Sequence, residues 1–170
     1  MDIRLLTSED AVPYRELRLR SLQENPEAFL VTYDSEVSKP IEDVQHKLQY
    51  SNNRFTLGAF DQDELVGMVT FIRESNAKTI HKGNIYAMYV SPEARGQKLG
   101  KALITELVQR ARLFEGLEQI HLTVISNNNA AKQLYQSLGF IVYGFERNAL
   151  KYEGQYWDEE FMVLDLILTR

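Results

Sequence analysis

The chain has 170 residues, 44% of them hydrophobic and 25% charged, which is the composition of one folded domain spanning residues 1–170. Nineteen Lys and Arg against 24 Asp and Glu give a formal charge of −5, which disfavours nucleic acid as a partner. Cysteine is absent, which excludes disulfides and thiolate chemistry and fits a cytoplasmic location. We find no secretory leader and no apolar run near the ~20 residues that span a bilayer, so we expect no membrane association.

The first half of the chain predicts a strand, two helices and a hairpin. Residues 3–6 read as a short strand, and Thr7, Ser8 and Asp10 offer caps for a helix that runs to about Gln23. Residues 41–50 form a second helical stretch. Residues 55–60 and 65–72 read as two strands that pair through a turn at 61–63.

The second half alternates strands with helices. Residues 84–90 are dense enough in apolar side chains for a strand buried on both faces, and residues 98–114 repeat apolar positions at helical spacing. A strand at 120–125, a helix at 129–138 closed by Gly139, and strands at 140–145 and 161–168 follow. This order predicts an α/β or α+β domain with a mixed sheet and helices on both faces.

The junction between the buried strand and the next helix carries the strongest chemical signal. A polar loop with Gly96 opens directly into a helix start with Gly100, and the free N–H groups of a first helical turn bind anions such as a diphosphate. A well-capped helix start explains the same residues. Gly100-Lys101 is followed by Ala102 rather than by Ser or Thr, so a Walker loop and a nucleotide phosphotransferase are disfavoured.

Residues 97–102 (Gln-Lys-Leu-Gly-Lys-Ala) resemble the cofactor loop of the GNAT superfamily of N-acetyltransferases, Gln/Arg-x-x-Gly-x-Gly/Ala. The resemblance is to small bacterial members, and it implies that the backbone of this turn holds the diphosphate of coenzyme A. Lys98 departs from the glycine of many members, which is tolerated unless the position requires a positive φ angle.

A second match spans residues 128–140, which resemble the family signature Asn-x-x-Ala-x-x-Leu-Tyr-x-x-Leu-Gly-Phe. The resemblance makes Tyr135 the general acid for the departing thiolate, although spacing alone also allows a half-buried aromatic side chain. Asn128 has two compatible duties, capping the helix and contacting the cofactor.

The resemblance also implies a mostly antiparallel sheet of about six to seven strands. Two of these strands splay apart, and the cofactor arm pairs with the backbone of the first. The amide of Val90 would then stabilise the oxyanion. The implied cofactor-binding residues are Met88, Tyr89, Val90, Arg95, Gly96, Gln97, Lys98, Leu99, Gly100, Lys101, Ala102, Asn128 and Tyr135.

The general base and the acceptor pocket are less defined. Asn84 stands where many members of the family have a glutamate, so the base must lie elsewhere, and the candidates by chemistry are His81, Glu27, Glu146 and Asp158. Substrates with a low amine pKa need no base. Segments 25–30 and 152–158 resemble those that frame the acceptor pocket, although they also suit loop anchors or a dimer surface. The candidate substrate contacts are Glu27, Phe29, Tyr33, Tyr86 and Tyr152.

We therefore predict an acetyl-CoA-dependent N-acetyltransferase that acts on a primary amine of a small molecule, amino acid, polyamine or peptide. The acidic balance of the chain mildly favours a cationic acceptor. The alternative is a non-catalytic sensor that binds acyl-CoA. Three dispersed histidines without a ligand cluster predict no metal, and a homodimer stays open.

Overall fold

The computed structural model of the chain describes residues 1–167, in which seven strands form one sheet flanked by five α-helices. The strands are β1 (Asp2–Leu5), β2 (Arg54–Asp61), β3 (Glu64–Arg73), β4 (Lys82–Val90), β5 (Gln119–Ile125), β6 (Ile141–Tyr152) and β7 (Gln155–Asp165). The helices are α1 (Ala11–Glu24), α2 (Tyr33–Val37), α3 (Ile41–Leu48), α4 (Leu99–Ala111) and α5 (Asn129–Ser137).

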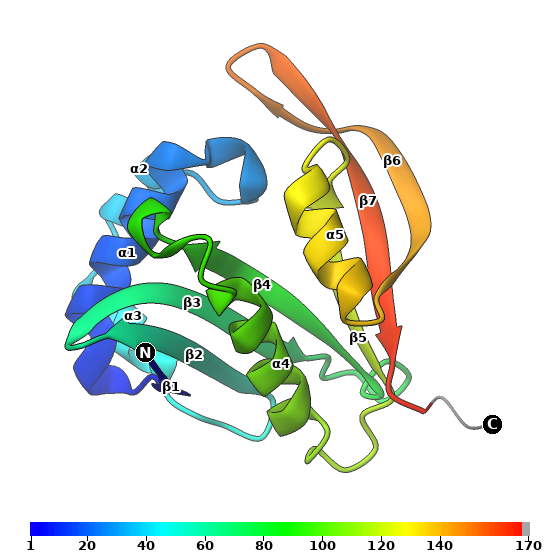
Figure 1. Cartoon of the computed structure of the whole chain (residues 1–170), viewed down its shortest axis with the longest axis horizontal. Coiled ribbons are helices and arrows are strands. Elements are labelled where there is room, and N and C mark those ends of the chain that lie inside the picture. Colours follow the sequence, from blue (N-terminus) through cyan, green and yellow to red (C-terminus); the bar gives the residue numbers. More distant parts are fainter. Residues whose placement is uncertain (168–170) are drawn as a thin grey trace.

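The strands lie in the order β1-β2-β3-β4-β5-β7-β6, and every neighbouring pair is antiparallel except β4 and β5. Helix α4 makes the crossover between these two parallel strands. Figure 1 shows the consequence, a sheet with two arms that meet near one end of β4 and β5 and diverge toward the other.

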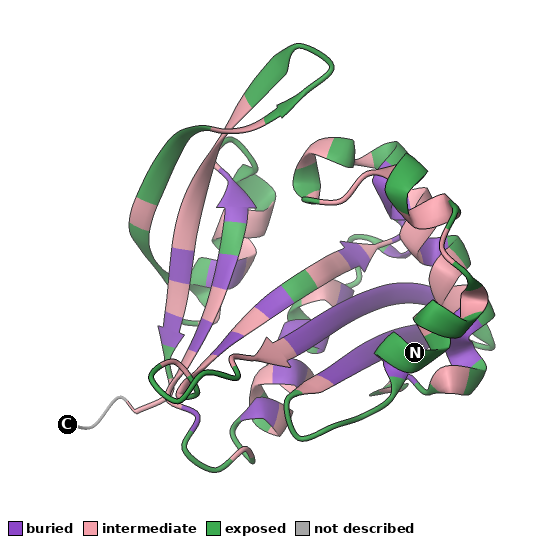
Figure 2. Cartoon of the chain, turned by 180° about the vertical axis from the view of Figure 1, so that it is seen from behind, coloured by how far each residue is buried: buried purple, intermediate pink, exposed green. Residues whose placement is uncertain are grey.

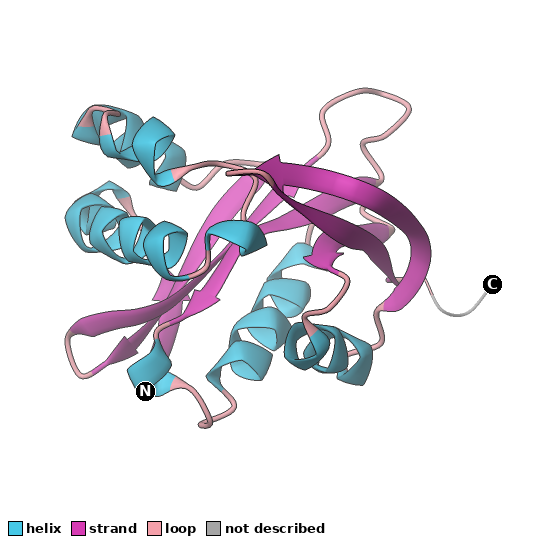
Figure 3. Ribbon diagram, turned by 90° about the horizontal axis from the view of Figure 1, so that it is seen from above, coloured by secondary structure: helices cyan, strands magenta, loops and turns pink. Residues whose placement is uncertain are grey.

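Helices cover both faces of the sheet (Figure 3). Helix α4 packs on one face through Leu103, Ile104 and Leu107, which are fully buried in a cluster that also contains Phe140 and Tyr135 from the region of α5. Helices α1 and α3 cover the other face and bury a second, smaller cluster around Met68. Figure 2 shows that β2 and β3 are buried over most of their length, whereas the tip of the β6–β7 hairpin is exposed.

Strand β4 contains a bulge near its middle. Thr70 of β3 pairs with Tyr86, and Met68 pairs with Tyr89, so one residue of β3 lies opposite two of β4. Ala87 in this bulge has φ of 54°, a left-handed conformation that is rare for a residue with a side chain. Strand β4 pairs with β5 only as far as Asn84, so the bulge lies in the part of β4 that no longer pairs with β5.

The structure confirms the predicted mixed sheet with helices on both faces and extends several elements. The last two strands are longer than expected, because an irregular register lets β6 and β7 pair across a long hairpin that ends at the turn 153–154. Helix α2 was not predicted, since it has only five residues and owes its start to a capping box between Thr32 and Ser35. Of the predicted last strand, Leu168 lies outside the described residues.

Candidate active site

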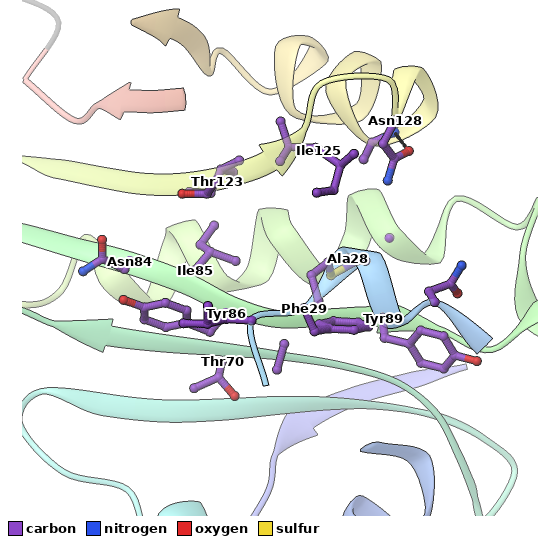
Figure 4. Close-up of a pocket in the computed structure, with 18 of the residues that line it drawn as sticks. Ala28, Phe29, Thr70, Asn84, Ile85, Tyr86, Tyr89, Thr123, Ile125 and Asn128 are labelled. Carbon is purple, nitrogen blue, oxygen red and sulfur yellow. Dashed lines mark hydrogen bonds between the residues drawn. The ribbon is translucent and has the colours of Figure 1, made fainter. Parts of the chain in front are cut away.

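A cleft opens where β4 and β5 part. The two strands pair only from Lys82 with Gln119 to Asn84 with His121, and beyond these residues they diverge. The cleft between them has a volume of about 1750 Å³ and continues along the face covered by α1 and α3. Figure 4 shows Thr123 and Ile125 of β5 across the gap from β4.

One end of the cleft is the N-terminus of α4. Its first backbone bond within the helix runs from the Ala102 N–H to the Lys98 carbonyl at 3.1 Å, so the N–H groups of residues 99–101 precede the helical ladder. Lys98 occupies the N-cap position with φ of 61° and makes no capping bond through its side chain, and Gly96 in the preceding loop has φ of 78°. The position of Lys98 thus does require a positive φ, and this chain accepts the strain.

Close packing holds this helix end in place. A Cβ atom at Gly100 would lie 3.3 Å from Leu134 of α5 and 3.4 Å from Met88 of β4, so only glycine fits without a shift of its neighbours. Arg95 donates through Nε to the Val90 carbonyl at 2.9 Å, and its guanidinium lies 5.7 Å from the ring centroid of Tyr89. Tyr89 in turn hydrogen-bonds Glu24 at the end of α1.

The structure brings most of the predicted cofactor residues together. Those lining the cleft are Met88, Tyr89, Val90, Arg95, Gly96, Lys98, Leu99, Gly100, Lys101, Asn128 and Tyr135. Gln97 and Ala102 are exposed and do not line it. Backbone N–H groups, positive side chains and an open groove suit a diphosphate followed by an extended arm.

The Val90 amide points into the cleft. In the antiparallel ladder with β3, the Ser91 N–H donates to the Val66 carbonyl at 2.8 Å, and Val90 opposite Gly67 belongs to a pair without mutual hydrogen bonds. The N–H and carbonyl of Val90 therefore face away from β3. Arg95 donates a hydrogen bond to the Val90 carbonyl, and the Val90 N–H remains available to a ligand.

Helix α5 supplies Asn128 and Tyr135. The Asn128 side chain caps the helix by accepting from the Ala131 N–H at 3.2 Å, which Figure 4 shows beside the cleft. Tyr135 is 7% exposed and packs edge-on against Phe140, with ring centroids 5.8 Å apart. Within residues 1–167 nothing hydrogen-bonds its hydroxyl, and burial raises the pKa of Tyr135 to about 12. The phenol is therefore protonated at neutral pH and free to donate.

The acceptor side contains only part of the predicted set. Glu27, Phe29 and Tyr86 line the cleft, and Phe29 packs against the cluster that contains Tyr89. Figure 4 shows Phe29 and Tyr86 along β4, with Thr70 below them. Tyr33 and Tyr152 do not line the cleft. Burial raises the pKa of Tyr86, and the nearby charge of Glu74 raises it further.

Three titratable residues that sequence reasoning missed also line the cleft: Glu74, His121 and Glu159. The Asn84 amide donates to Glu74 Oε1 at 2.9 Å, which places a carboxylate beside the position where the family has its glutamate. Burial lowers the pKa of His121, and both ring nitrogens have partners, Tyr143 at 3.2 Å and Gln119 at 3.0 Å.

Glu159 lies on the opposite wall of the cleft, on β7. Burial raises the pKa of its carboxyl, and the charge of Glu146 raises it further. Glu74, His121 and Glu159 lie far apart in the sequence and line one cleft only because of the strand register, so no local motif marks them.

The base candidates taken from sequence are distributed differently. Glu27 lines the cleft, whereas His81, Glu146 and Asp158 do not. Asp158 has a structural contact, since its Oδ1 accepts from the Asn148 N–H at 2.7 Å within the β6–β7 hairpin.

The sheet thus splays open beside a helix start whose first N–H groups have no partner within the helix. The model of the acetyltransferase (GNAT) family matches residues 15–140, and the chain belongs to this family of enzymes. The solved acetyltransferase of the GNAT family from Streptococcus pneumoniae superposes with a TM-score of 0.89 at 24% identity, covering 97% of this chain and 99% of that one.

Other relatives differ in what they are named for. A mycothiol acetyltransferase of Actinosynnema mirum is 32% identical over 78% of this chain, and an L-methionine sulfoximine/L-methionine sulfone acetyltransferase of Pseudomonas paraeruginosa is 34% identical over 50%. The matches span 40% and 49% of those proteins, so this chain covers less than half of either. A phosphinothricin acetyltransferase from Sinorhizobium meliloti, solved with acetyl-CoA, has a TM-score of 0.80 at 24% identity, covering 97% of this chain and 88% of that one.

No group of three or more His, Cys, Asp or Glu side chains within residues 1–167 is arranged to hold a metal ion. No helix in the same range is long and apolar enough to cross a membrane.

Proposed function

We propose that the chain transfers the acetyl group of acetyl-CoA to a primary amine, with the donor in the cleft between β4 and β5. The observation that carries this proposal is the joint presence of Tyr135, the free Val90 N–H and the N-terminus of α4 around one groove. Bound acetyl-CoA would supply a thioester carbonyl for the amine to attack. The relatives are named for different substrates, so they do not indicate which amine this chain acetylates.

Each group at the site has a defined task. The Val90 N–H donates to the carbonyl oxygen as negative charge develops there. Tyr135 gives its proton to the sulfur as the carbon–sulfur bond breaks. Glu74 takes the proton that the attacking amine loses through a relay of water molecules in the cleft, because its carboxylate lies beside Asn84 and the six residues from Asn84 to Val90 span roughly 20 Å of strand.

The raised pKa of Tyr135 remains compatible with this task. A phenol with a pKa of about 12 is roughly 3.5 units weaker as an acid than a thiol of about 8.5, which makes the proton transfer uphill by about 5 kcal/mol. Turnover at 1–10³ s⁻¹ corresponds to barriers of about 13–17 kcal/mol. The transfer therefore fits within the barrier of a working enzyme.

The test combines acetyl-CoA binding by calorimetry with thiol release on a panel of polyamines, amino acids, aminoglycosides and peptides. We expect binding, amine-dependent release, and a loss of about 100-fold or more in kcat for Tyr135→Phe with the acetyl-CoA Kd unchanged. Binding without turnover on any amine would favour the sensor function instead. Absence of binding would overturn the proposal.

A further inference from the structure

The cleft contains two groups of cationic side chains, and the proposed binding of acetyl-CoA accounts for only one of them. Arg95, Lys98 and Lys101 lie at the α4 end, where phosphates would sit. A second group lies on the wall formed by α1, α3 and the start of β2: Arg18, Lys47, Arg54 and Lys39. This second group is on the acceptor side of the sheet, away from the α4 end.

Two guanidinium groups on this wall bury unpaired nitrogens. Arg18 Nη1 and Arg54 Nε are inaccessible to solvent and have no hydrogen-bond partner in the described part of the chain. The Arg18 Cζ lies 4.6 Å from the ring centroid of Phe29, so the side chain is held in place by stacking rather than by an ion pair. A buried donor left unpaired costs about 1–3 kcal/mol, and more when it is charged. Such a cost indicates a partner that arrives with a ligand.

The carboxylates on the same wall offset these groups only in part. Glu36 and Asp43 also line it, and Glu36 Oε1 lies 2.6 Å from Lys39 Nζ. Burial lowers the pKa of Arg18 and the charge of Glu36 opposes this shift, but within residues 1–167 Glu36 forms no hydrogen bond with Arg18 or Lys47. Burial lowers the pKa of Lys47, the nearby Lys39 and Arg54 lower it further, and the charge of Glu36 opposes them. Four cations thus face two carboxylates on this wall.

The Arg18 end of the wall approaches the reacting centre, because Arg18 stacks on Phe29 and Phe29 packs against the cluster that contains Tyr89, the neighbour of Val90. The Arg54 end of the wall leads to the fork of the strands. Arg54 pairs with Ile72, Ile72 with Asn84, and Asn84 with His121, so these residues form one row on one face of the sheet. With strands spaced about 4.8 Å apart, Arg54 lies roughly 10 Å along this row from the backbone of Asn84. One acceptor can therefore place its amine near Val90 and another group at Arg18.

We infer that the acceptor carries a carboxylate as well as the amine, and that Arg18 binds this carboxylate with help from Arg54 and Lys47. The guanidinium fork matches a planar carboxylate, and a charge-assisted contact there satisfies the buried donors. The acceptor is thus an amino acid or a related aminocarboxylate rather than a polyamine. This inference rests on the proposed N-acetyltransferase activity.

The first experiment compares matched acceptors that differ only in the carboxylate. Phenylalanine, phenylalanine amide and phenethylamine, and the corresponding set built on methionine, are assayed for thiol release with saturating acetyl-CoA. We expect kcat/KM at least 100-fold higher for the acids. The amide has the more weakly basic amine and so more free amine at neutral pH, which means that intrinsic reactivity works against the expected order.

The second experiment uses variants with the preferred acid. Arg18→Met is expected to raise its KM at least 30-fold without changing the KM of phenethylamine or the Kd of acetyl-CoA, and Arg18→Lys should restore only part of the loss. Arg15→Met is the matched control, because Arg15 lies on the same helix, donates to the Val37 carbonyl and does not line the cleft. If Arg18→Met does not fold, Arg54→Met carries the test with the same expectation.

The two proposals fail differently. Equal kcat/KM for acids, amides and simple amines, or a preference for polyamines, would overturn the carboxylate site and leave the acetyltransferase proposal standing. Acetyl-CoA binding without acetylation of any acceptor would overturn both. An unchanged KM for the acid in folded Arg18→Met and Arg54→Met would also refute the assignment of these arginines.

Discussion

At the scale of single residues, Glu74 is the group whose role depends most on the fold. It lies ten positions from Asn84 in the chain, and the β3–β4 pairing brings its carboxylate to 2.9 Å from the Asn84 amide. Sequence reasoning identified Asn84 as the substituted position but could not find the replacement. In the proposed mechanism, this carboxylate, which directly follows β3, replaces one on β4.

Replacing Glu74 with Gln should therefore remove the proton acceptor while keeping the shape of the site. We expect kcat/KM for thiol release to fall about 100-fold at neutral pH, with the acetyl-CoA Kd unchanged. Glu146→Gln is the control, because Glu146 does not line the cleft. A Glu74→Gln enzyme with the kcat/KM of the wild type would assign the proton transfer to another group, such as Glu159.

The raised pKa of Tyr135 makes the free energy of unfolding depend on pH in the alkaline range. Its pKa is about 12 in the folded chain and about 10 when unfolded, so both states are protonated below pH 10. Above that value the unfolded chain ionises first, and the folded state loses about 1.4 kcal/mol per pH unit until the pH passes the folded pKa of about 12.

The prediction is a smaller alkaline loss of stability in Tyr135→Phe. Urea unfolding at pH 10 and pH 11 should show the wild type losing about 1 kcal/mol more than the variant. Tyr89, whose pKa is also raised to about 12 by burial and by its bond to Glu24, is present in both proteins and cancels in the comparison. Equal losses in the two proteins would mean that the hydroxyl is not buried as described.

At the scale of elements, the sequence predicted the helices and strands whose formation depends on residues close together in the chain. The helices at 99–111 and 129–137 follow from apolar spacing and a capping residue, and the hairpin at 54–73 follows from alternating apolar strands around a turn. The bulge at Ala87 and the long β6–β7 hairpin depend on pairing between distant residues. The cleft, the Asn84–Glu74 contact and the row that ends at Arg54 depend on the same long-range register.

Helix α5 shows how one residue serves both an element and a ligand. Asn128 caps the helix that carries Tyr135, and its side chain also lines the cleft. Asn128→Ala should destabilise the chain by about 1 kcal/mol through loss of the cap. Asn128→Asp keeps the oxygen that accepts the capping bond. It replaces the NH₂ group of the side chain with a negative charge near the proposed acetyl-CoA site.

The two variants separate the duties of Asn128. We expect Asn128→Asp to keep near wild-type stability in urea unfolding and to bind acetyl-CoA more weakly by calorimetry. If Asn128→Asp binds acetyl-CoA as the wild type does, the residue is a cap alone.

At the scale of the whole molecule, the cleft is lined by more positive than negative side chains, whereas the chain as a whole is negatively charged. The formal net charge is −5, yet the cleft is lined by nine cations and five carboxylates. The cations are Arg18, Lys39, Lys47, Arg54, Arg73, Lys82, Arg95, Lys98 and Lys101, and the carboxylates are Glu27, Glu36, Asp43, Glu74 and Glu159. The sequence average pointed mildly to a cationic acceptor, whereas the local arrangement favours anions at both ends of the groove.

This distribution makes donor binding sensitive to salt. Raising sodium chloride from about 0.1 M to about 1 M shortens the screening length from about 10 Å to about 3 Å, which weakens contacts between exposed cations and phosphates. We expect the acetyl-CoA Kd from calorimetry to rise about tenfold, since Arg95, Lys98 and Lys101 are exposed. Lys101→Gln should reduce this salt dependence, whereas Lys151→Gln, a change on the exposed hairpin outside the cleft, should not. A Kd independent of salt would mean that the backbone N–H groups of α4 hold the phosphates without help from these side chains.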